Sequence, residues 1–489
     1  MDLGSIIQFL EDKTILVTGS TGFVAKMLVE KILRIQPNVK KLFLLLRDTD
    51  TKSAAQRLND EVMETELFRV LREKYGANFS SLISEKVLPI SGDISCEHLG
   101  IKDFDLRKKM WREIDIIVNS AATTKFDERY DVALSINVFG VLHTLNFAKN
   151  CANIKMLLHV STAFVCGERA GLILEKPFYM GETLNGATGL DIDTEKKLAE
   201  KRLNDHLVEE TTEKAITLAM KDLGIQRARL YGWPNTYVFT KAMGEMLLMH
   251  LKENLPVVII RPTVISSTYK EPFPGWLEGL RTIDSFFVLY GKGKLTTTIY
   301  NPKSIIDIIP GDMMVNSIIM AIVVHANESS KIIYHVGSSV RNPIRHANLE
   351  DFISRYFTRN PWIDRNGKPI KVGKLIVLST MTSFRLYMAI RYKIPLKVLQ
   401  FLNIALCKSL ESTCFNLNQK FNSMIRLVEL YKSYLFFEGI FDDTNTERLR
   451  VAAKGNNIEA DVLYFDPMCI DWEDYFMNIH LPGIVKCLF

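Results

Sequence analysis

Short apolar runs alternate with longer amphipathic segments over the first third of the chain. The short runs are rich in aliphatic and β-branched residues, as buried strands are, whereas FVAKMLVEKILRIQ, after the first run, has apolar residues at helical spacing. The predicted strands are TILVTG, KKLFLLLR, KVLPISGDI, IDIIVNSAA and MLLHVSTAFV. This alternation is typical of βαβ units and predicts a parallel sheet with helices on both faces.

Two later runs extend the predicted sheet, VVIIRPTVI from Val257 and KIIYHVGS from Lys331. Between them, MMVNSIIMAIVVHA from Met313 is the longest apolar stretch. It contains Asn316 and is shorter than the roughly 20 residues of a membrane-spanning helix, so we interpret it as a buried helix. The pattern as a whole predicts a Rossmann-type, doubly wound α/β domain over residues 1–345.

A long insertion at about 168–232 interrupts this domain. It begins with a loop-like segment, and its charged sequence from Thr194 to about Leu223 predicts one solvated helix. The drier side of that helix is expected to carry Leu198, Leu203, Leu207 and Ala215. The insertion is either a surface elaboration or a lid or wall over a substrate channel, because it leaves the sheet beside the candidate catalytic residues described below.

Residues 346–489 are predicted to form a smaller, mainly helical C-terminal domain. From Arg365 to Leu410 this part has nine Lys or Arg and no acidic residue, interleaved with Leu, Ile, Phe, Tyr and Met. A helical segment that is both basic and apolar can lie on an anionic membrane surface or bind an anionic amphiphile. The alternative is a packed helical domain with a solvated basic face.

Composition narrows the class of protein. With 47% hydrophobic and 24% charged residues among 489, the chain is globular and long enough for two domains. A net charge of +5 is too dilute to indicate a nucleic-acid partner, but it is compatible with a phosphorylated cofactor. The seven cysteines form no CxxC pair, so no disulfide framework and no metal site is predicted, and a reducing compartment is expected. Because the first strand starts at Thr14, no signal or plastid transit peptide is expected.

The first predicted strand runs directly into GSTGFVAK, which places Gly19, Gly22 and Ala25 in the spacing G-x-x-G-x-x-A. Small residues are needed in such a turn because backbone N–H groups and a helix N-terminus must approach a pyrophosphate closely. A glycine spacing alone is a weak signal, but its position between a strand and an amphipathic helix indicates a dinucleotide site. The residues expected to contact the cofactor here are Thr18, Gly19, Ser20, Thr21, Gly22, Phe23 and Val24.

Arg47 ends the second predicted strand, where an NAD enzyme usually has a carboxylate for the ribose 2′-hydroxyl. An arginine there favours the 2′-phosphate of NADPH, unless it only pairs with the nearby Asp48 or Asp50. Further cofactor contacts are expected at the ends of later strands. They are Asp93 and Ile94 beside the adenine, Asn119, Ala121 and Ala122 where the backbone must approach the cofactor, and Pro262 and Thr263.

NTYVFTK places Tyr237 and Lys241 on one face of a helix. A phenol with a pKa of about 10 is a poor acid–base group at neutral pH, and an adjacent ammonium favours its ionised form. Both residues are also expected to contact the cofactor, the lysine through the nicotinamide ribose. The preceding strand ends in HVSTAFVCG, where Thr162 is the candidate hydroxyl for a substrate carbonyl and Ser161 the alternative. Together these residues predict a nicotinamide-dependent reductase.

Cys166 lies in the same loop and raises a second mechanism, in which a thiol carries an acyl group. No nearby residue is evidently placed to activate it, so we interpret it as a structural thiol.

Five segments resemble those of the fatty acyl-CoA reductase family, most closely its plant, alcohol-forming branch. ILVTGSTGFVAK resembles the family's NADPH motif, VNSAATTKFDERYD its segment after the fourth strand, and GWPNTYVFTKAMGE its active-site stretch. IIRPTVISSTYKEPFPGW and VELYKSYLFFEGIFDDTN are similar to further segments, the second of them in the C-terminal domain. The resemblance spans nearly the whole chain and implies an extended short-chain dehydrogenase fold followed by the family's C-terminal domain.

The resemblance also implies reduction of a long-chain acyl-CoA to a primary alcohol with two NADPH. Hydride reduction of the thioester gives a hemithioacetal that loses CoA, and the aldehyde is then reduced at the same Tyr237 and Thr162. Two positions depart from the family's pattern, Val24 in place of Leu and Ala25 in place of Gly, and neither threatens cofactor binding. Plastid members carry an N-terminal extension, so the cytosolic side is expected here, with peripheral association with the endoplasmic reticulum membrane through residues 365–410 as a hypothesis.

Two other functions compete with this interpretation. An extended short-chain dehydrogenase acting on a sugar nucleotide or another carbonyl compound would have the same turn and the same Tyr–Lys pair. Such enzymes, however, usually end before a C-terminal domain of this size. A non-catalytic nucleotide-sensing or lipid-binding scaffold would not need the intact set of Thr162, Tyr237 and Lys241. The reductase is therefore the preferred prediction.

Overall fold

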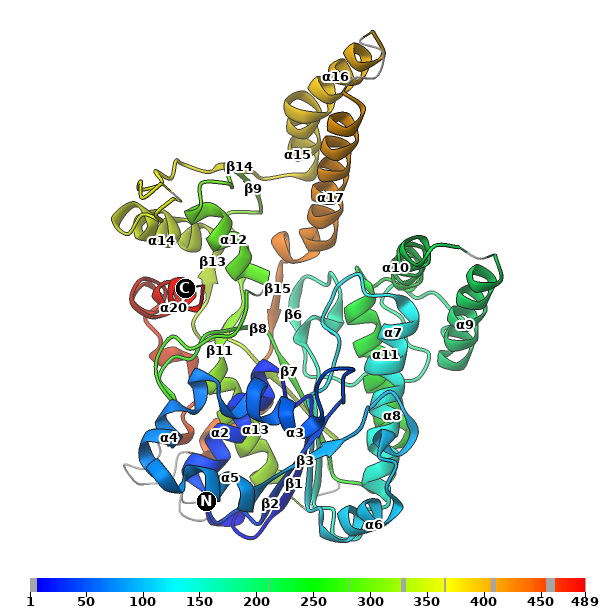
Figure 1. Ribbon diagram of the computed structural model, residues 1–489, viewed down its shortest axis with the longest axis vertical. Coiled ribbons are helices and arrows are strands. Elements are labelled where there is room, and N and C mark those ends of the chain that lie inside the picture. Colours follow the sequence, from blue (N-terminus) through cyan, green and yellow to red (C-terminus); the bar gives the residue numbers. More distant parts are fainter. Residues whose placement is uncertain are drawn as a thin grey trace.

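The computed structural model describes residues 7–209, 211–280, 282–326, 331–364, 366–405, 410–453 and 462–488. Its centre is a parallel sheet of seven strands in the order β12-β7-β5-β4-β1-β2-β3 (Figure 1). These strands are β1 Thr14–Thr18, β2 Lys41–Leu46, β3 Val87–Ser91, β4 Ile116–Asn119, β5 Met156–Val160, β7 Val257–Pro262 and β12 Lys331–Val336. All seven predicted strands and the doubly wound α/β fold are thus confirmed.

Helices cover both faces of the sheet, so each central strand is buried on both sides. In β1, Ile15 and Val17 belong to the apolar cluster of one face, and Leu16 belongs to that of the other. The first face is covered by α2 (Phe23–Ile35) and α13 (Gly311–His325), and the second by α6 (Phe104–Glu113) and α8 (Gly140–Lys149). Two-sided burial explains why the strands are continuous apolar runs rather than alternating ones.

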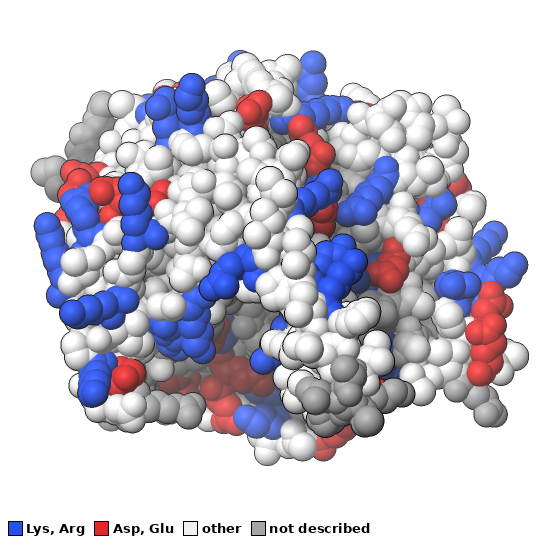
Figure 2. Space-filling view, turned by 90° about the horizontal axis from the view of Figure 1, so that it is seen from above, with Lys and Arg blue, Asp and Glu red and all other residues white. Residues whose placement is uncertain are grey.

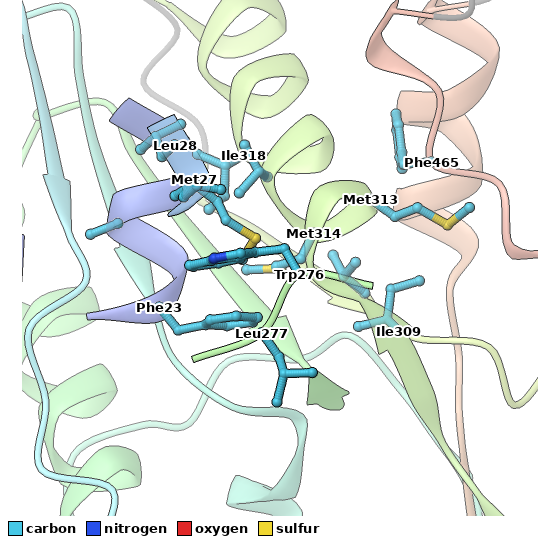
Figure 3. Packing of buried hydrophobic residues seen from close by; sticks show 14 of the residues in the cluster. Phe23, Met27, Leu28, Trp276, Leu277, Ile309, Met313, Met314, Ile318 and Phe465 are labelled. Atoms are coloured by element: carbon cyan, nitrogen blue, oxygen red, sulfur yellow. The ribbon is translucent and has the colours of Figure 1, made fainter. Parts of the chain in front are cut away.

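The apolar stretch from Met313 is a buried helix, as predicted. It forms most of α13, which packs against α2. Figure 3 shows the contact, where the Phe23 ring lies flat on Trp276, with 5.0 Å between centroids and 7° between planes. Met27 and Met314 lie beside this pair. The packing holds the first turn of α2 firmly against the rest of the protein.

One helical run among the described residues, Tyr130–Lys149, has the length and mean hydropathy of a membrane span. It covers α7 (Tyr130–Leu134), a π-turn and α8, and 56% of it is buried inside the fold, as in a core helix. Length and composition alone are therefore weak support for a membrane span here.

The insertion contains two helices, α9 (Ile192–Val208) and α10 (Glu213–Leu230), so the single helix predicted from Thr194 to Leu223 is wrong. The two helices pack against each other, and Arg227 on α10 forms an ion pair with the buried Glu195 on α9. The predicted dry side is wrong at Leu207 and Ala215, which are exposed. The face buried instead consists of Ile192, Glu195 and Ala199 on α9 and of Ile216, Met220, Gly224 and Ala228 on α10.

The chain after residue 345 is mainly helical, as predicted, although the boundary at 345 stays a prediction. It contains α14 His346–Arg359, β14 Ile376–Leu378, α15 Met381–Met388, α16 Ile394–Ala405, α17 Glu411–Leu435, β15 Gly439–Phe441, α18 Thr444–Ala453, α19 Trp472–Asp474 and α20 Leu481–Cys487. β15 pairs with β6 (Gly171–Ile173) of the insertion, and β14 pairs with β9 (Thr297–Ile299). This part of the chain is therefore tied to the sheet domain at several places.

Other elements complete the fold around the sheet. They are α3 Ala54–Leu58, α4 Arg69–Tyr75, α5 Phe79–Lys86, α11 Thr236–Leu251, α12 Thr282–Gly291, β8 Val264–Ser266, β10 Ile305–Ile306, β11 Ile308–Pro310 and β13 Ile344–Arg345. Of these, α11 packs against α7, α8 and α10 and carries the candidate catalytic residues.

Helices α15, α16 and α17 form an arm that projects away from the sheet (Figure 1). The base of the arm is an apolar cluster that includes Phe384 and Met388, and α16 packs against α17. Most of the basic segment 365–410 lies in this arm, while residues 365 and 406–409 lie outside the described residues. Seen from above, this end of the molecule has a broad uncharged area surrounded mostly by Lys and Arg (Figure 2).

Candidate active site

The predicted site residues gather at one edge of the sheet. Thr18, Arg47, Asn119 and Thr162 end or follow β1, β2, β4 and β5, and the carboxyl ends of these parallel strands lie together. The chain order of the strands reverses between β1 and β4. Open α/β sheets bind their ligands at this point, outside the carboxyl ends of the strands.

Gly19 makes the turn that follows β1. Its φ of +70° lies in the left-handed region, and a Cβ atom there would come within 2.8 Å of the Ala121 backbone. The next helix, α2, has Gly22 at its N-cap and no side-chain cap. The turn therefore presents backbone and a helix N-terminus to an anionic ligand, which fits the pyrophosphate of a dinucleotide.

Three predicted cofactor residues use their side chains inside the protein. Phe23 and Ile94 lie in the apolar clusters on the two faces of the sheet, and the Ser20 hydroxyl donates to a backbone carbonyl at 2.9 Å. Because these side chains are used inside the protein, only the backbone at these positions can contact a cofactor. Thr21 and Val24 are partly exposed at the turn.

Arg47 extends from the end of β2 with 63% of its side chain exposed. Its guanidinium is 3.9 Å from Asp93 Oδ2, a separation that makes a weak ion pair at an exposed position. Asp48 accepts hydrogen bonds from the Ala54 N–H at 2.7 Å and from the Ser91 hydroxyl. These contacts do not favour the alternative in which Asp48 neutralises Arg47.

The Thr162 hydroxyl lies close enough to the Tyr237 phenol to affect its pKa. Burial raises the pKa of Tyr237 to about 12, and the nearby Thr162 hydroxyl opposes the shift, so the phenol is protonated at neutral pH. Thr162 accepts from the Phe164 N–H at 3.3 Å, which orients its side chain. Ser161 Oγ is buried and has no partner among the described residues. Of the two candidate hydroxyls, Thr162 is the one beside the phenol.

Lys241 lies one helical turn after Tyr237 and is almost fully buried. Its Nζ donates to the Val160 carbonyl at 2.8 Å and lies 3.3 Å from His159 Nε2. Burial lowers the pKa of Lys241 to about 8, and the carboxylate of Glu245 partly opposes this shift. The lysine can therefore change its charge close to physiological pH.

Asn119, Ala121 and Ala122 lie after β4, beside the glycine turn. Asn119 Oδ1 accepts a hydrogen bond from the Thr18 hydroxyl at 2.7 Å, and that hydroxyl accepts from the Ala121 N–H at 3.2 Å. The side chain of Asn119 is thus hydrogen-bonded to Thr18, whereas the sequence analysis expected only that the backbone here approaches the cofactor. Ala122 is partly exposed.

Pro262 and Thr263 lie at the end of β7. The Thr263 N–H donates to the Val336 carbonyl at 3.1 Å and so joins β7 to β12. Both residues are buried, and their contact with a cofactor stays a prediction.

Cys166 is buried in the turn after β5, and burial raises the pKa of its thiol to about 12. A thiol with that pKa is not an activated nucleophile. The geometry favours the interpretation as a structural residue.

Helix α17 brings aromatic side chains that the sequence analysis missed. Tyr434 accepts a hydrogen bond from Asn235 Nδ2 at 3.0 Å and stacks on Phe126, with 4.8 Å between ring centroids. Phe126 also stacks on Tyr237 at 6.1 Å. Asn235 itself caps α11, so α17 touches the residue that begins the catalytic helix. The segments with Phe126 and Tyr434 were noted only for their resemblance, and no pattern in either predicts that they meet.

Two family models, both described as Male sterility protein, match the chain at residues 17–318 and 391–489, and the first is an NAD-binding model. The chain is 55% identical over 487 residues to the alcohol-forming fatty acyl-CoA reductase of Simmondsia chinensis, with 99% of each chain covered. It is also 55% identical over 482 residues to fatty acyl-CoA reductase 1 of Arabidopsis thaliana, with 98% of each covered.

Solved structures share this fold at low sequence identity. The reductase domain of a non-ribosomal peptide synthetase from Mycobacterium tuberculosis has a TM-score of 0.56 and 17% identity, covering 100% of this chain and 96% of that one. The terminal R domain of the myxalamid pathway has a TM-score of 0.57 and 17% identity, covering 97% and 91%. These structures support the fold alone, whereas the full-length identity to plant relatives shows that the chain belongs to the fatty acyl-CoA reductase family.

Proposed function

We propose that this protein reduces a long-chain fatty acyl-CoA to the primary alcohol with NADPH. The observation that supports this most directly is the Tyr237 phenol beside the Thr162 hydroxyl, with Lys241 one turn further along the same helix. The group lies at the edge of the sheet where the glycine turn fits a dinucleotide. A proton donor, a carbonyl-binding hydroxyl and a cofactor turn are the parts that a carbonyl reductase needs.

The cofactor would be held by the turn from Gly19 to Gly22, the N-terminus of α2 and Arg47. When bound, NADPH supplies the hydride for both reductions. The protein's own part is to bind, to orient and to provide protons. The tight packing of Phe23 on Trp276 keeps the first turn of α2 in place for this task.

In the first reduction, Thr162 orients the thioester carbonyl and Tyr237 Oη gives its proton to the carbonyl oxygen. The resulting phenolate is stabilised by the positive charge of Lys241. The hemithioacetal then expels CoA as its thiol, and an aldehyde carbonyl takes the place of the thioester. After Tyr237 is reprotonated, the same residues assist the second reduction. Since the leaving sulfur belongs to the substrate, Cys166 is not needed.

Arg47 supports the choice of NADPH over NADH. Its exposed guanidinium at the end of β2 can form charge-assisted hydrogen bonds with a 2′-phosphate. We expect Arg47→Ala to weaken NADPH binding about tenfold or more while leaving NADH binding nearly unchanged. Fluorescence titration of both cofactors tests this, and equal losses would remove the argument.

The test of the activity is incubation of the purified protein with NADPH and acyl-CoAs of several chain lengths, followed by gas chromatography of the lipids. Fatty alcohol is the expected product. Aldehyde alone would mean that the second reduction does not occur. If neither appears with any chain length while a sugar nucleotide or other carbonyl compound is consumed, the acyl-CoA proposal is wrong.

We also propose that the arm associates with an anionic membrane surface. Large apolar side chains are exposed along it, among them Phe401 at 80% and Ile404 at 72%. Lys397 is exposed on the same helix, α16, and Arg391 and Lys393 are exposed on the π-helical segment just before it. Exposed apolar groups bordered by basic ones are typical of helices that lie in the headgroup region, and a long acyl chain is most concentrated there.

Flotation with liposomes tests this association. The protein is expected to float with vesicles that contain phosphatidylserine, and less with phosphatidylcholine alone. Replacing Lys393 and Lys397 by Gln should reduce flotation, because each basic residue near an anionic surface contributes about 1 kcal/mol. The matched control replaces the exposed Lys197 and Lys201 of α9 by Gln. Equal behaviour of the two variants would contradict the proposal.

A further inference from the structure

His159 lies between Lys241 and the glycine turn. It is buried on β5, with Nε2 3.3 Å from Lys241 Nζ and Nδ1 3.3 Å from Asn119 Nδ2. Asn119 Oδ1 accepts from the Thr18 hydroxyl at 2.7 Å, and that hydroxyl accepts from the Ala121 N–H at 3.2 Å. Side chains of β1, β4, β5 and α11 thus form one buried chain of hydrogen bonds, from Lys241 to the end of β1.

The Ala121 N–H, at one end of this series of hydrogen bonds, determines the direction of each bond in it. The Ala121 N–H can only donate, so Thr18 Oγ1 accepts from it and directs its own hydrogen to Asn119 Oδ1. The opposite orientation of the amide would leave the hydroxyl hydrogen without an acceptor among the described residues. Asn119 therefore presents its NH₂ group to His159 Nδ1. That nitrogen must accept, so the imidazole proton lies on Nε2.

The hydrogen on His159 Nε2 points at Lys241 Nζ. This arrangement favours the neutral amine form of Lys241 over the charged ammonium form. An ammonium has only donors and would face the N–H of the imidazole, whereas an amine has a lone pair that accepts from it. The amine can still donate to the Val160 carbonyl at 2.8 Å. Burial acts in the same direction, because it lowers the pKa of Lys241 to about 8.

Several other ionisable groups on the elements around Lys241 have partners of their own. On the same helix, Tyr237 lies beside Thr162, and the charge of Glu245 is balanced by its ion pair with Arg261 of β7. β4 has no ionisable residue, and Cys166 after β5 is a neutral thiol. On the helices packed against α11, Asp131, Lys149 and Arg227 pair with Arg129, Glu253 and Glu195. His159 is therefore the neutral group best placed to influence the lysine.

We propose that His159 is a positioning residue for Lys241, which it holds through Nε2–H and whose proton affinity it lowers because Asn119 and Thr18 fix its tautomer. It acts only through the lysine. A lysine of lower proton affinity returns a proton more readily toward the Tyr237 phenolate, which must be reprotonated between the two reductions. The chain also ties the lysine to the turn that fits the cofactor.

The kinetic test compares the pH dependence of kcat in the wild type and in His159→Gln. In the wild type, kcat is expected to fall as the pH rises through about 8, because the ammonium that stabilises the phenolate is lost. Gln can turn its amide oxygen toward the ammonium, so this alkaline limb should move up by about half to one pH unit, the effect of one hydrogen bond. His346→Gln, which changes a histidine on α14, should leave the limb in place.

A lower kcat with an unmoved limb in His159→Gln would mean that His159 only fills space, and it would overturn the proposal. This kinetic test rests on the proposed reduction. A second measurement does not, since it needs no turnover.

That second measurement is ¹⁵N NMR of the histidine side chains in the protein without substrate. The His159 signals are identified by their loss in His159→Gln or, if that variant does not fold, by their change in Thr18→Val. The Nε2–H tautomer is expected in the wild type, and a share of Nδ1–H in Thr18→Val, because Asn119 is then free to turn. The Nδ1–H tautomer in the wild type would overturn the proposal, whatever substrate the enzyme reduces.

Discussion

Burial shifts the pKa values of Tyr237 and Lys241 in opposite directions. Burial disfavours the charged form of each group, so it raises the pKa of the phenol to about 12 and lowers that of the lysine to about 8. At neutral pH the phenol keeps its proton and most of the lysine is charged. Both forms are the ones that proton donation to a carbonyl requires, and the pair loses this combination as the pH rises above 8.

Replacing Tyr237 by Phe removes the proton donor and leaves the ring in place. We expect kcat for acyl-CoA reduction to fall about 100-fold or more, the usual contribution of general acid catalysis. The affinity for NADPH, measured by fluorescence, should change little. Tyr431→Phe is the matched control, because that phenol belongs to the same aromatic group around Phe126. Near-normal turnover in Tyr237→Phe would show that the proton comes from elsewhere.

The two hydroxyls after β5 should differ in function and in stability. Thr162→Val loses the hydroxyl beside Tyr237 and the contact with the carbonyl, so kcat should fall roughly 100-fold. Ser161→Ala removes a buried hydroxyl without a partner among the described residues. The free energy of unfolding should therefore rise by about 1 kcal/mol, with activity largely kept. Denaturant unfolding and steady-state rates test both, and the reverse result would make Ser161 the catalytic hydroxyl.

At the scale of elements, α17 controls how the catalytic helix begins. Tyr434 receives a hydrogen bond from Asn235, the N-cap of α11, and Arg426 forms ion pairs with Asp127 after β4 and with Asp222 on α10. One helix from the end of the chain thus contacts the loop after β4, the insertion and the start of α11. The insertion and α17 together form the surroundings of the site, which supports the lid or wall interpretation without testing it.

Tyr434→Phe should show how much this docking contributes. The change leaves the buried amide of Asn235 without its acceptor, so the free energy of unfolding is expected to fall by about 1–3 kcal/mol. Because Asn235 caps the helix that carries Tyr237, kcat should fall as well, while the affinity for NADPH stays near normal. Tyr392→Phe, an exposed tyrosine on the arm, is the control. Unchanged stability and rate would mean that α17 does not position α11.

The sequence predicted well the elements whose structure is determined by neighbouring residues in the chain. Each strand is a run of apolar residues buried on both faces, and the glycine turn needs small residues whatever surrounds it. The candidate pair of Tyr237 and Lys241 could be proposed from the sequence for the same reason, since one helical turn separates the two residues. The comparisons bear out the family that the motifs suggested.

What the sequence did not reveal depends on contacts between distant parts of the chain. Tyr434 meets Asn235 across 199 positions, and His159 meets Lys241 across 82. The insertion was predicted as one helix because its charge pattern continues across the break. The two helices are joined by the ion pair of Glu195 and Arg227, which no periodicity reveals. Partners of this kind are set by packing, whereas periodicity reports only which face of an element is buried.

At the scale of the whole molecule, the C-terminal part closes onto the sheet domain through a buried polar joint. Glu175 of the insertion accepts hydrogen bonds from the His335 N–H of β12 at 2.8 Å and from the Asn445 N–H of α18 at 2.6 Å. Burial raises the pKa of this carboxyl to about 7. β15 pairs with β6 beside it. The arm therefore extends from a well-joined body, and Tyr434 at its base lies beside the site.

This arrangement predicts that α16, the outer helix of the arm, affects substrate delivery and not the chemistry. In a variant with Phe401→Glu and Ile404→Glu, the acidic groups cannot enter the headgroup region of an anionic membrane. The rate with a long-chain acyl-CoA held in phosphatidylserine vesicles should fall several-fold, while the rate with a shorter acyl-CoA free in solution stays near normal. Val208→Glu, at an exposed apolar position on α9, is the matched control. Equal losses with both substrates would place the arm in the folding or chemistry of the enzyme, and no loss with either would separate it from substrate delivery.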